Sequence, residues 1–495
     1  MSENKSSYLQ ILKTTSLFGG VQFFNIIISI IRTKLIAIFI GPAGMGIATL
    51  LNSTINIISG ITGLGIDTSA VKHISGSYKD DDLSSVSTNV AIVRKLALIT
   101  GILGTLLTLF LSGWLSQLTF GNSKHTFSFV FLSITLLFKQ LSTGQLAVLQ
   151  GLRKMRFLAK ANLYGNLFGL LFSIPLYYYY RIDAIAPTII VASLSSLLLS
   201  FYYSKKINIV KVNVSNHQLT SEGKNIIRLG IMLTLSGFLT LLSTYLIQIY
   251  VGKIGGLEEV GFYNAGFTLL NSYVGIIFTV MATDYFPRLA SICDENDKVR
   301  TSVIQQSFMS ILIITPIIIL FLIFIPLIIK ILYTPKFISI MSMVCFGILG
   351  MLFRAVSWSM GYIIIAKGDS KIFIKTSLGF NLLSLALNGF GYYFYGLEGL
   401  GFSFLVYYLI HFFVVKIIVK RKYGFYFDDD FYKIYLICVA MCIITFLFSY
   451  IEFLILKYGL MSLMGLISLI FVLLQINKKI DLKGIFNSVI NRKND

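Results

Sequence analysis

Apolar stretches of about 20 residues, each long enough to cross a lipid bilayer as an α-helix, recur along the whole chain. No stretch between them is long enough to form a soluble domain. Hydrophobic residues make up 56% of the sequence and charged residues only 13%. The sequence therefore predicts an all-α integral membrane protein with about 14 transmembrane helices. We expect these spans at residues 13–40, 43–66, 90–112, 127–150, 161–180, 184–203, 229–252, 260–286, 303–330, 338–365, 373–395, 399–418, 434–451 and 459–476.

The 41 Lys and Arg residues are distributed unevenly over the two predicted sides of the membrane. Six of the 41 fall in or beside the loops of one side and four fall well inside spans, which leaves 31 in or beside the loops of the side that carries both termini. Short cytoplasmic loops are enriched in basic residues, so we expect both termini in the cytoplasm. The formal net charge of +20 thus indicates topology, and a nucleic-acid partner is not expected. The six residues on the outer side are Lys124, Arg181, Lys253, Lys330, Lys336 and Lys457.

Three short sequence matches, in the same order, relate the first half of the chain to the second. Their offsets in residue number are 219, 217 and 215, and each offset covers six predicted spans. An even number of spans preserves the direction of crossing, so the halves are predicted to be parallel repeats of the kind found in transporters. The matches pair Thr49–Ser53 with Thr268–Ser272, Gly144–Gly151 with Gly361–Gly368, and Tyr177–Tyr180 with Tyr392–Tyr395.

The repeat predicts two six-helix lobes around a central cavity, followed by two helices outside the repeat. The N-terminal lobe would cover residues 1–203 and the C-terminal lobe residues 229–418, with the additional helices at 434–476. Residues 204–228 are the longest polar stretch and form a cytoplasmic linker between the lobes. This linker is either a hinge on which the lobes rock or a passive connection whose basic residues face the membrane.

Four basic residues lie more than five residues inside both ends of a predicted span, where a charge is costly unless it faces a cavity or a partner. At 1.5 Å per residue, Lys139 lies roughly 15 Å inside the cytoplasmic end of its span, and Arg354 lies roughly 18 Å inside the equivalent end. Arg32 lies roughly 12 Å from the outer end of the first span. Lys34 is two residues nearer to that end, so its ammonium group could also reach the outer surface.

Lys139 and Arg354 are the most informative of the four cations. They precede Gly144 by five residues and Gly361 by seven, so each half places one cation at a similar depth on equivalent helices. Neither of the two spans contains an acidic residue. Unpaired cations around a central cavity predict an anionic substrate. Arg can donate two parallel hydrogen bonds to phosphate or carboxylate oxygens, and Lys acts as a point charge. We therefore predict Arg32, Lys34, Lys139 and Arg354 as substrate-binding residues.

Asp67 and Asp284 fall at the cytoplasmic ends of spans 2 and 8, at nearly matching positions. They are candidates for coupling or gating, through a bound proton or an ion pair with a basic residue such as Lys72 or Arg288. The alternative is that they are solvated residues of the membrane interface. The sequence shows no metal-ligand spacing, no phosphate-binding loop and no nucleophile with its base. We therefore expect no enzyme, cofactor or metal site.

Four segments resemble bacterial polysaccharide flippases of the O-antigen translocase type, which belong to the multidrug/oligosaccharidyl-lipid/polysaccharide exporter superfamily. Two of the segments lie in each half, and the resemblance extends over spans 1–12. Arg32 also matches an arginine in the first helix of related flippases for lipid-linked cell-wall precursors, whereas Lys139 and Arg354 match no family motif. The segments are Arg32–Gly46, Gly65–His73, Glu258–Asn264 and Met281–Leu289.

The resemblance implies a bacterial inner-membrane protein with two six-helix lobes in a V shape around a cationic cavity. It implies a substrate of undecaprenyl-diphosphate-linked oligosaccharide, moved from the cytoplasmic to the periplasmic leaflet by alternating access. Partners that it implies besides membrane lipids are a polysaccharide polymerase, chain-length proteins, and protons or sodium ions. Two rival functions stay open. An ion-coupled multidrug exporter would favour intramembrane acids, and a membrane polymerase or ligase would favour a large periplasmic loop.

Overall fold

The computed structural model describes residues 24–79, 83–207, 209, 212 and 214–479, so the first part of the first predicted span lies outside the described residues. An α-helix covers residues 24–39. The elements that follow are α2 (Gly41–Gly63), α3 (Ile66–Lys79), α4 (Leu83–Phe110), α5 (Ser112–Phe120), α6 (Thr126–Gly151), α7 (Met155–Tyr180), η1 (Arg181–Ala184), α8 (Ile185–Lys205), α9 (Asn216–Gly255), α10 (Leu257–Thr268), η2 (Leu269–Val274), α11 (Ile276–Ser291), α12 (Asn296–Leu332), η3 (Pro335–Ile340), α13 (Met341–Ala366), α14 (Ser370–Tyr423), α15 (Asp429–Phe448) and α16 (Leu454–Lys479).

Eleven helical segments of the described chain are long and apolar enough to cross a membrane. Two of them, Met155–Lys205 and Ser370–Tyr423, each hold two of the predicted spans joined by a turn. With both divided at their turns, and with the apolar helix over residues 24–39 added, the described chain contains the fourteen predicted helices. The prediction of an all-α, multi-pass membrane protein is confirmed.

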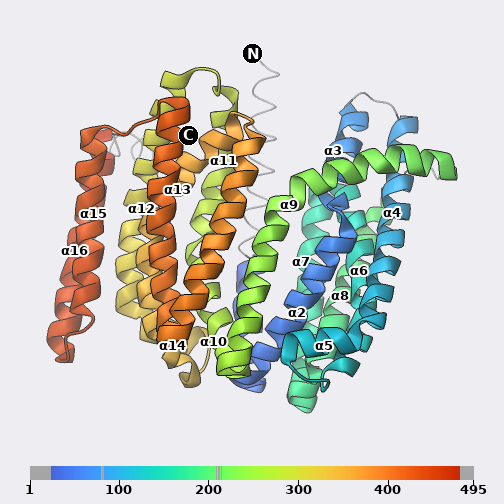
Figure 1. Cartoon of the computed structure of the whole chain (residues 1–495), viewed down its shortest axis with the longest axis horizontal. Coiled ribbons are helices and arrows are strands. Elements are labelled where there is room, and N and C mark those ends of the chain that lie inside the picture. Colours follow the sequence, from blue (N-terminus) through green and yellow to red (C-terminus); the bar gives the residue numbers. More distant parts are fainter. Residues whose placement is uncertain (1–23, 80–82, 208, 210–211, 213, 480–495) are drawn as a thin grey trace, which may run out of the picture. The chain divides into compact units, whose positions relative to one another are not determined.

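The helices pack into two compact units (Figure 1). The first unit consists of the described residues up to Gly261 together with Leu332–Lys336, and the second consists of Phe262–Ile331 together with the described residues from Phe337 onward. Helix α9 belongs to the first unit, where it packs against α2 and α3. The two units are defined by which helices pack together, whereas the predicted lobes are defined by the sequence repeat. The two descriptions differ for α9, most of which the prediction assigns to the C-terminal lobe and the packing assigns to the first unit.

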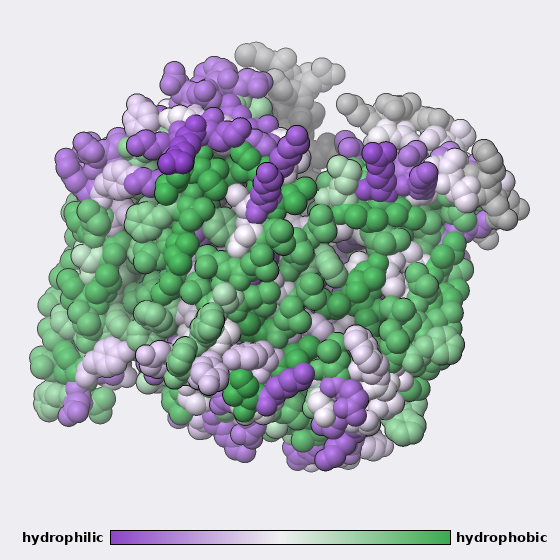
Figure 2. All heavy atoms as spheres, viewed as in Figure 1, coloured by the Kyte–Doolittle hydropathy of each residue, from purple (hydrophilic) through white to green (hydrophobic). Residues whose placement is uncertain are grey.

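Apolar side chains cover the middle of the helices in each unit, and hydrophilic side chains gather at the helix ends (Figure 2). Helix α4 is an example, since Leu103, Leu106 and Phe110 are all exposed to the surroundings. Apolar surface of this extent is unstable in water and is expected where a protein contacts lipid. The hydropathy of the surface therefore agrees with the spans that the sequence predicts.

Helix α9 is attached to the first unit at two points along its length. Near its middle, Gly230 lies so close to Gly65 that a Cβ atom on either would stand 2.3 Å from a carbonyl oxygen of the other segment. Near its end, the hydroxyl of Tyr245 is hydrogen-bonded to Thr54 of α2, at 3.0 Å, and to Thr119 of α5, at 2.6 Å. Close backbone contact through small residues and buried hydrogen bonds are the usual means of joining helices inside a membrane.

The described part of the 204–228 linker packs onto the first unit. The ammonium group of Lys95 in α4 donates a hydrogen bond of 2.8 Å to the carbonyl oxygen of Val214. The side chains of Val214 and Ile226 are buried in the apolar cluster that α3, α4 and α6 form. A linker fixed in this way differs from a free tether, so any rocking of the lobes would have to break or carry along these contacts.

The backbone shows that the repeat has one constant offset, the offset of 215 that relates the two tyrosine clusters. Three pairs of residues at this offset have positive φ angles, at turns between spans. In the third pair the ψ angles also agree, at −123° for Arg181 and −138° for Gly396. The Thr-Leu-Leu-Asn-Ser match at offset 219 is therefore out of register by about one helical turn. The three pairs are Gly41 (φ 65°) with Gly256 (87°), Arg153 (54°) with Gly368 (69°), and Arg181 (51°) with Gly396 (56°).

Two further counterparts at this offset touch each other within the first unit. A Cβ atom on Gly46 would lie 1.9 Å from the carbonyl oxygen of Leu257, and one on Gly261 would lie 2.1 Å from the carbonyl oxygen of Pro42. The constant offset relates Gly46 to Gly261, and it also relates Pro42 to Leu257. The contact is thus reciprocal, as a local twofold axis between the starts of α2 and α10 requires.

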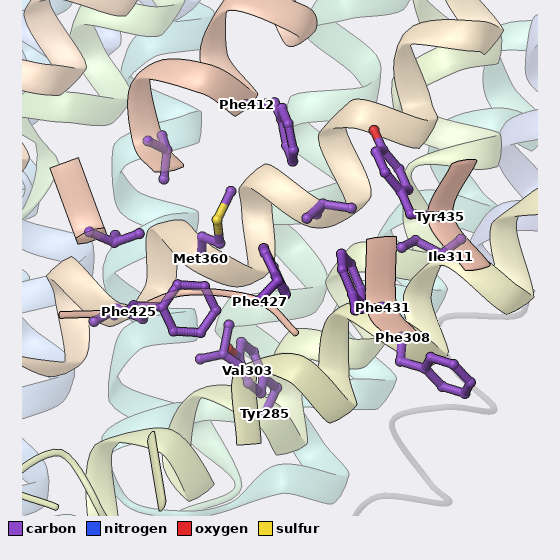
Figure 3. Close-up of a cluster of buried hydrophobic side chains, with 14 of the residues drawn as sticks. Tyr285, Val303, Phe308, Ile311, Met360, Phe412, Phe425, Phe427, Phe431 and Tyr435 are labelled. Carbon is purple, nitrogen blue, oxygen red and sulfur yellow. The ribbon is translucent and has the colours of Figure 1, made fainter. Parts of the chain in front are cut away.

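The second unit has an aromatic core (Figure 3). The rings of Phe427 and Phe431 are stacked with centroids 4.0 Å apart, and Tyr435 continues the stack at 6.0 Å from Phe431. These rings meet Phe308 of α12 and Met360 of α13 in one buried cluster. The cluster joins α15, which lies outside the repeat, to helices inside it.

We predict that Gly46→Ala and Gly261→Ala each destabilise the protein by about 1–3 kcal/mol, because the added methyl group would overlap a backbone oxygen that cannot move alone. Gly237→Ala on α9 is the matched control, since nothing lies within 4 Å of its Cβ position. The measurement is the thermal unfolding midpoint of the purified full-length protein in detergent. Unchanged midpoints for both contact variants would contradict the reciprocal packing.

Candidate functional site

In the first unit, the intramembrane cation Lys139 lies on α6 and faces α2. Its ammonium group donates a hydrogen bond of 2.6 Å to the side-chain oxygen of Asn56. The neighbouring Gln140 holds the same pair of helices together, because its amide nitrogen donates to the backbone oxygen of Ser59 at 3.1 Å. The Lys139 side chain is half-buried, and the contact leaves its charge paired with a neutral amide.

In the second unit, Arg354 lies on α13 and makes the same kind of contact. Its Nη1 group donates a hydrogen bond of 2.7 Å to the side-chain oxygen of Asn271 in η2. The guanidinium also lies 5.2 Å from the ring centroid of Phe278 and 5.4 Å from that of Tyr408. Rings at this distance attract a cation through their π faces without neutralising it. The side chain is therefore held in place while its charge stays uncompensated.

The two cation–amide pairs are counterparts in the repeat. The constant offset relates Lys139 to Arg354, and the same offset relates Asn56 to Asn271. An offset of 217, taken from the glycine match, relates the two cations only approximately. With the constant offset that the backbone conformations show, both members of each pair correspond. Each half of the chain thus contains the same arrangement, a half-buried cation that is hydrogen-bonded to an asparagine side chain.

No carboxylate forms an ion pair with either cation among the described residues. The ion pairs there number three, and each joins exposed side chains within one helix turn. Asp67 is near enough to Lys139 to attract it electrostatically, but its own side chain is exposed. A charge in an apolar layer is costly unless something compensates it. An anionic ligand would supply the direct ion pair that the described residues do not provide.

The two other cations that are predicted to bind substrate, Arg32 and Lys34, are hydrogen-bonded to backbone carbonyl oxygens. Arg32 donates from Nη2 to the carbonyl oxygen of Asn166 at 3.1 Å, which joins the helix over residues 24–39 to α7. Asn166 in turn donates to the side chain of Asn25 at 3.1 Å. Lys34 donates to the carbonyl oxygen of Tyr333, in the segment between α12 and η3. Both residues are half-buried, and both contacts have a structural role whether or not a ligand binds.

The two predicted acids differ in their surroundings. Asp67 is in the first turn of α3, where a negative charge stabilises the helix. Asp284 is paired with Arg288 at 3.7 Å, one turn further along α11, and 85% of its side chain is exposed. A pair within one helix cannot by itself close a gate between two helices. The structure therefore places Asp67 near a predicted substrate residue and Asp284 in a solvated pair.

Sequence reasoning missed Asn56 and Asn271, although the necessary signal was present. The offset that relates the tyrosine clusters at 177–180 and 392–395 also relates the two asparagines. The pentapeptide match concealed this, because it pairs Asn271 with Asn52. The asparagines show that the cations are positioned by amides, which hold a side chain by hydrogen bonding without adding charge.

The fold is that of transporters of the MOP superfamily. The lipid II flippase MurJ in an inward closed conformation has a TM-score of 0.66 and 17% identity, and the match covers 94% of this chain and 99% of that one. An inward-facing multidrug resistance transporter of the MATE family also has a TM-score of 0.66, with 14% identity and coverage of 81% and 94%. At these identities the likeness concerns the fold alone.

Sequence comparison defines the family more closely. Residues 14–342, which are more than half of the chain, match the family described as Polysaccharide biosynthesis protein. A protein of Shigella flexneri that is named for a proposed role as an O-antigen transporter is 24% identical over 372 residues, which are 74% of this chain and 87% of that protein. The chain belongs to the Polysaccharide biosynthesis protein family.

We predict that Asn271→Asp raises the thermal unfolding midpoint of the purified protein by a few degrees, because a carboxylate at 2.7 Å would compensate the Arg354 charge. Asn271→Leu, which has a similar size but no acceptor, should lower the midpoint. The pair of variants separates charge compensation from packing. A midpoint for Asn271→Asp at or below that of Asn271→Leu would show that Arg354 is already neutralised.

Proposed function

We propose that the protein is a flippase that moves an undecaprenyl-diphosphate-linked oligosaccharide, such as an O-antigen unit, from the cytoplasmic to the periplasmic leaflet of a bacterial inner membrane. The family membership and the relative named for O-antigen transport support a polysaccharide substrate. The MurJ-like fold is compatible with a substrate that is anchored in lipid. Both termini are proposed to be cytoplasmic, from the distribution of basic residues.

The observation that carries this proposal is the repeated cation–amide pair. Lys139 and Arg354 are half-buried, are held by hydrogen bonds, and have no carboxylate partner among the described residues. A diphosphate is a suitable ligand for such cations, because a guanidinium group can donate two parallel hydrogen bonds to its oxygens and an ammonium group adds a point charge. Arg32 and Lys34 are proposed to extend the cationic surface toward the outer side.

In the proposed cycle, the diphosphate and the first sugars enter a water-filled central cavity while the lipid tail stays in the bilayer. Rocking of the two lobes then exchanges the inward and outward openings. The linker and α9 would either move together with the first unit, to which hydrogen bonds fasten their described residues, or break these contacts. Asp67, which is exposed near Lys139, is proposed to act in coupling or gating, with protons or sodium ions as the candidate coupling ions.

A multidrug exporter is the rival within the same fold, since a MATE transporter reaches the same TM-score as MurJ, although over less of this chain. Organic cations would require anionic residues inside the membrane, whereas the predicted site is cationic. A polymerase or ligase would require catalytic side chains on a sizeable outer loop, and the predicted outer loops are short. The charge of the site therefore favours an anionic substrate.

We predict that Lys139→Ala and Arg354→Ala each reduce surface polysaccharide at least tenfold in a strain that lacks the native gene. Loss of one charge-assisted contact costs about 1.5–3 kcal/mol, which is roughly a 10- to 150-fold effect. Lys139→Arg should retain much of the activity, and Arg354→Lys less, because Lys cannot bind in a bidentate manner. The measurement is polysaccharide per cell at matched protein levels.

Lys124→Gln, which removes an exposed cation from an outer loop, is the control and should leave the polysaccharide unchanged. The double variant Asn56→Asp, Asn271→Asp neutralises both cations without deleting them and should also be inactive. Wild-type polysaccharide from the two Ala variants would refute the site. Drug resistance that depends on the protein while polysaccharide does not would favour the multidrug exporter.

A further inference from the structure

A pocket of about 720 Å³ lies in the second unit, and its lining includes neither Arg354 nor Asn271. It is lined by the end of α11, one face of α12 and the start of α15. Helices α12 and α15 run side by side in the same direction, since Arg300 contacts Tyr426 just before α15 and Thr315 contacts Cys442 further along. Both helices start on the side that is predicted to be cytoplasmic.

The pocket changes from charged to apolar along its length. At the helix starts it is lined by Asp297, Arg300 and Asp430, and deeper in the membrane by Phe308 and Met309. The stretch from Asp297 to Met309 extends about 18 Å along the helix axis. The walls therefore match a molecule with a charged head and an apolar chain of that length.

The side chain of Arg300 is held in a fixed position at the charged end of the pocket, where it could bind an anion. Its Nε group donates to the carbonyl oxygen of Tyr426 at 3.0 Å, and its guanidinium lies 3.6 Å from the centroid of the Tyr426 ring. These contacts fix the side chain, and the two Nη groups have no hydrogen-bond partner among the described residues. Arg288 also lines the pocket and is the second cation there.

Carboxylates share the same end of the pocket. Asp297, Asp428 and Asp430 all line it, beside the two arginines. Asp428 caps α15 by accepting from the backbone N–H of Phe431 at 2.8 Å, and Asp430 is paired with Lys433 at 3.3 Å. A purely anionic ligand would be repelled by these acids, and a purely cationic ligand by the arginines. A ligand that carries both charges is complementary to the site.

We propose that this pocket binds a zwitterionic aminophospholipid, of the phosphatidylethanolamine type, from the leaflet on the predicted cytoplasmic side. The phosphate diester would face Arg300 and Arg288, and the primary ammonium would donate hydrogen bonds to the Asp297 carboxylate. One acyl chain would lie along Ile304, Phe308 and Ile434. The proposal does not depend on the substrate that the protein transports.

The lipid would join α15 to the repeat. The pocket borders the stacked rings of Phe431 and Tyr435, and Figure 3 shows Phe308 and Phe431 together at this edge of the core. A bound lipid would thus connect an element outside the repeat to α11 and α12 inside it.

Native mass spectrometry of the purified full-length protein tests the proposal with dioleoyl lipids that differ only in the head group. We expect phosphatidylethanolamine to bind at least five times more tightly than phosphatidylglycerol, which has no ammonium, and phosphatidylcholine, whose quaternary ammonium has no N–H donor. Water-soluble glycerophosphoethanolamine should not bind detectably, because it lacks the chain that fills the apolar end.

Arg300→Gln should weaken phosphatidylethanolamine binding about tenfold, as expected for loss of a charge-assisted hydrogen bond, and Arg300→Lys should weaken it less. Ile304→Trp should block the acyl end. Lys298→Gln is the matched control, because Lys298 lies on the same turn of α12 but pairs with Glu295 and does not line the pocket. Monodisperse elution of each variant shows that it is folded. Equal binding of phosphatidylglycerol, or binding that Arg300→Gln leaves unchanged, would overturn the proposal.

Discussion

A lipid bilayer contains no water to bond with the backbone, and this constraint determines most of what the chain can do. Nearly every N–H and C=O group of an apolar span must be satisfied within a helix. The apolar side chains of such a span then pack against each other or against lipid. Polar and charged residues that persist in such spans are therefore conspicuous, and each requires a partner or a function. Lys139 and Arg354 stand out because their partners are neutral amides.

The amide partner has a specific physical consequence. A carboxylate would compensate the charge and leave the cation with little affinity for an anion, whereas an apolar neighbour would leave the side chain without a fixed position. Asparagine avoids both outcomes, since its oxygen accepts one hydrogen bond and adds no charge. The same arrangement occurs at matching positions of both repeats, 215 residues apart. For Arg354, the rings of Phe278 and Tyr408 add further support without neutralising the charge.

The spans could be predicted from the sequence because hydropathy and length determine them residue by residue. The register of the repeat was harder, since a five-residue match in so apolar a chain carries little information. The positive φ angles of Arg181 and Gly396 establish the register, because an unusual turn conformation occurs at few positions whereas apolar residues occur at many. The packing of α9 against the turn between α2 and α3 could not be foreseen, because it depends on the meeting of Gly230 with Gly65 in space.

Part of the proposed site could be identified from the sequence. Charges within spans identified Lys139 and Arg354, because their cost follows from depth alone. Their asparagine partners and aromatic neighbours come from other helices, so only the three-dimensional structure could bring them together. The pocket between α12 and α15 was not anticipated for the same reason, since it requires the parallel course of two helices that are far apart in the sequence.

We propose that the two cation–amide pairs recognise the diphosphate of a lipid-linked substrate. The most direct test of this proposal is the equilibrium affinity of the purified full-length protein for undecaprenyl diphosphate compared with undecaprenol, which has the same chain without phosphate. We expect the diphosphate to bind at least tenfold more tightly, and we expect Lys139→Ala with Arg354→Ala to abolish the difference. Equal affinities of the unmodified protein for the two lipids would contradict it.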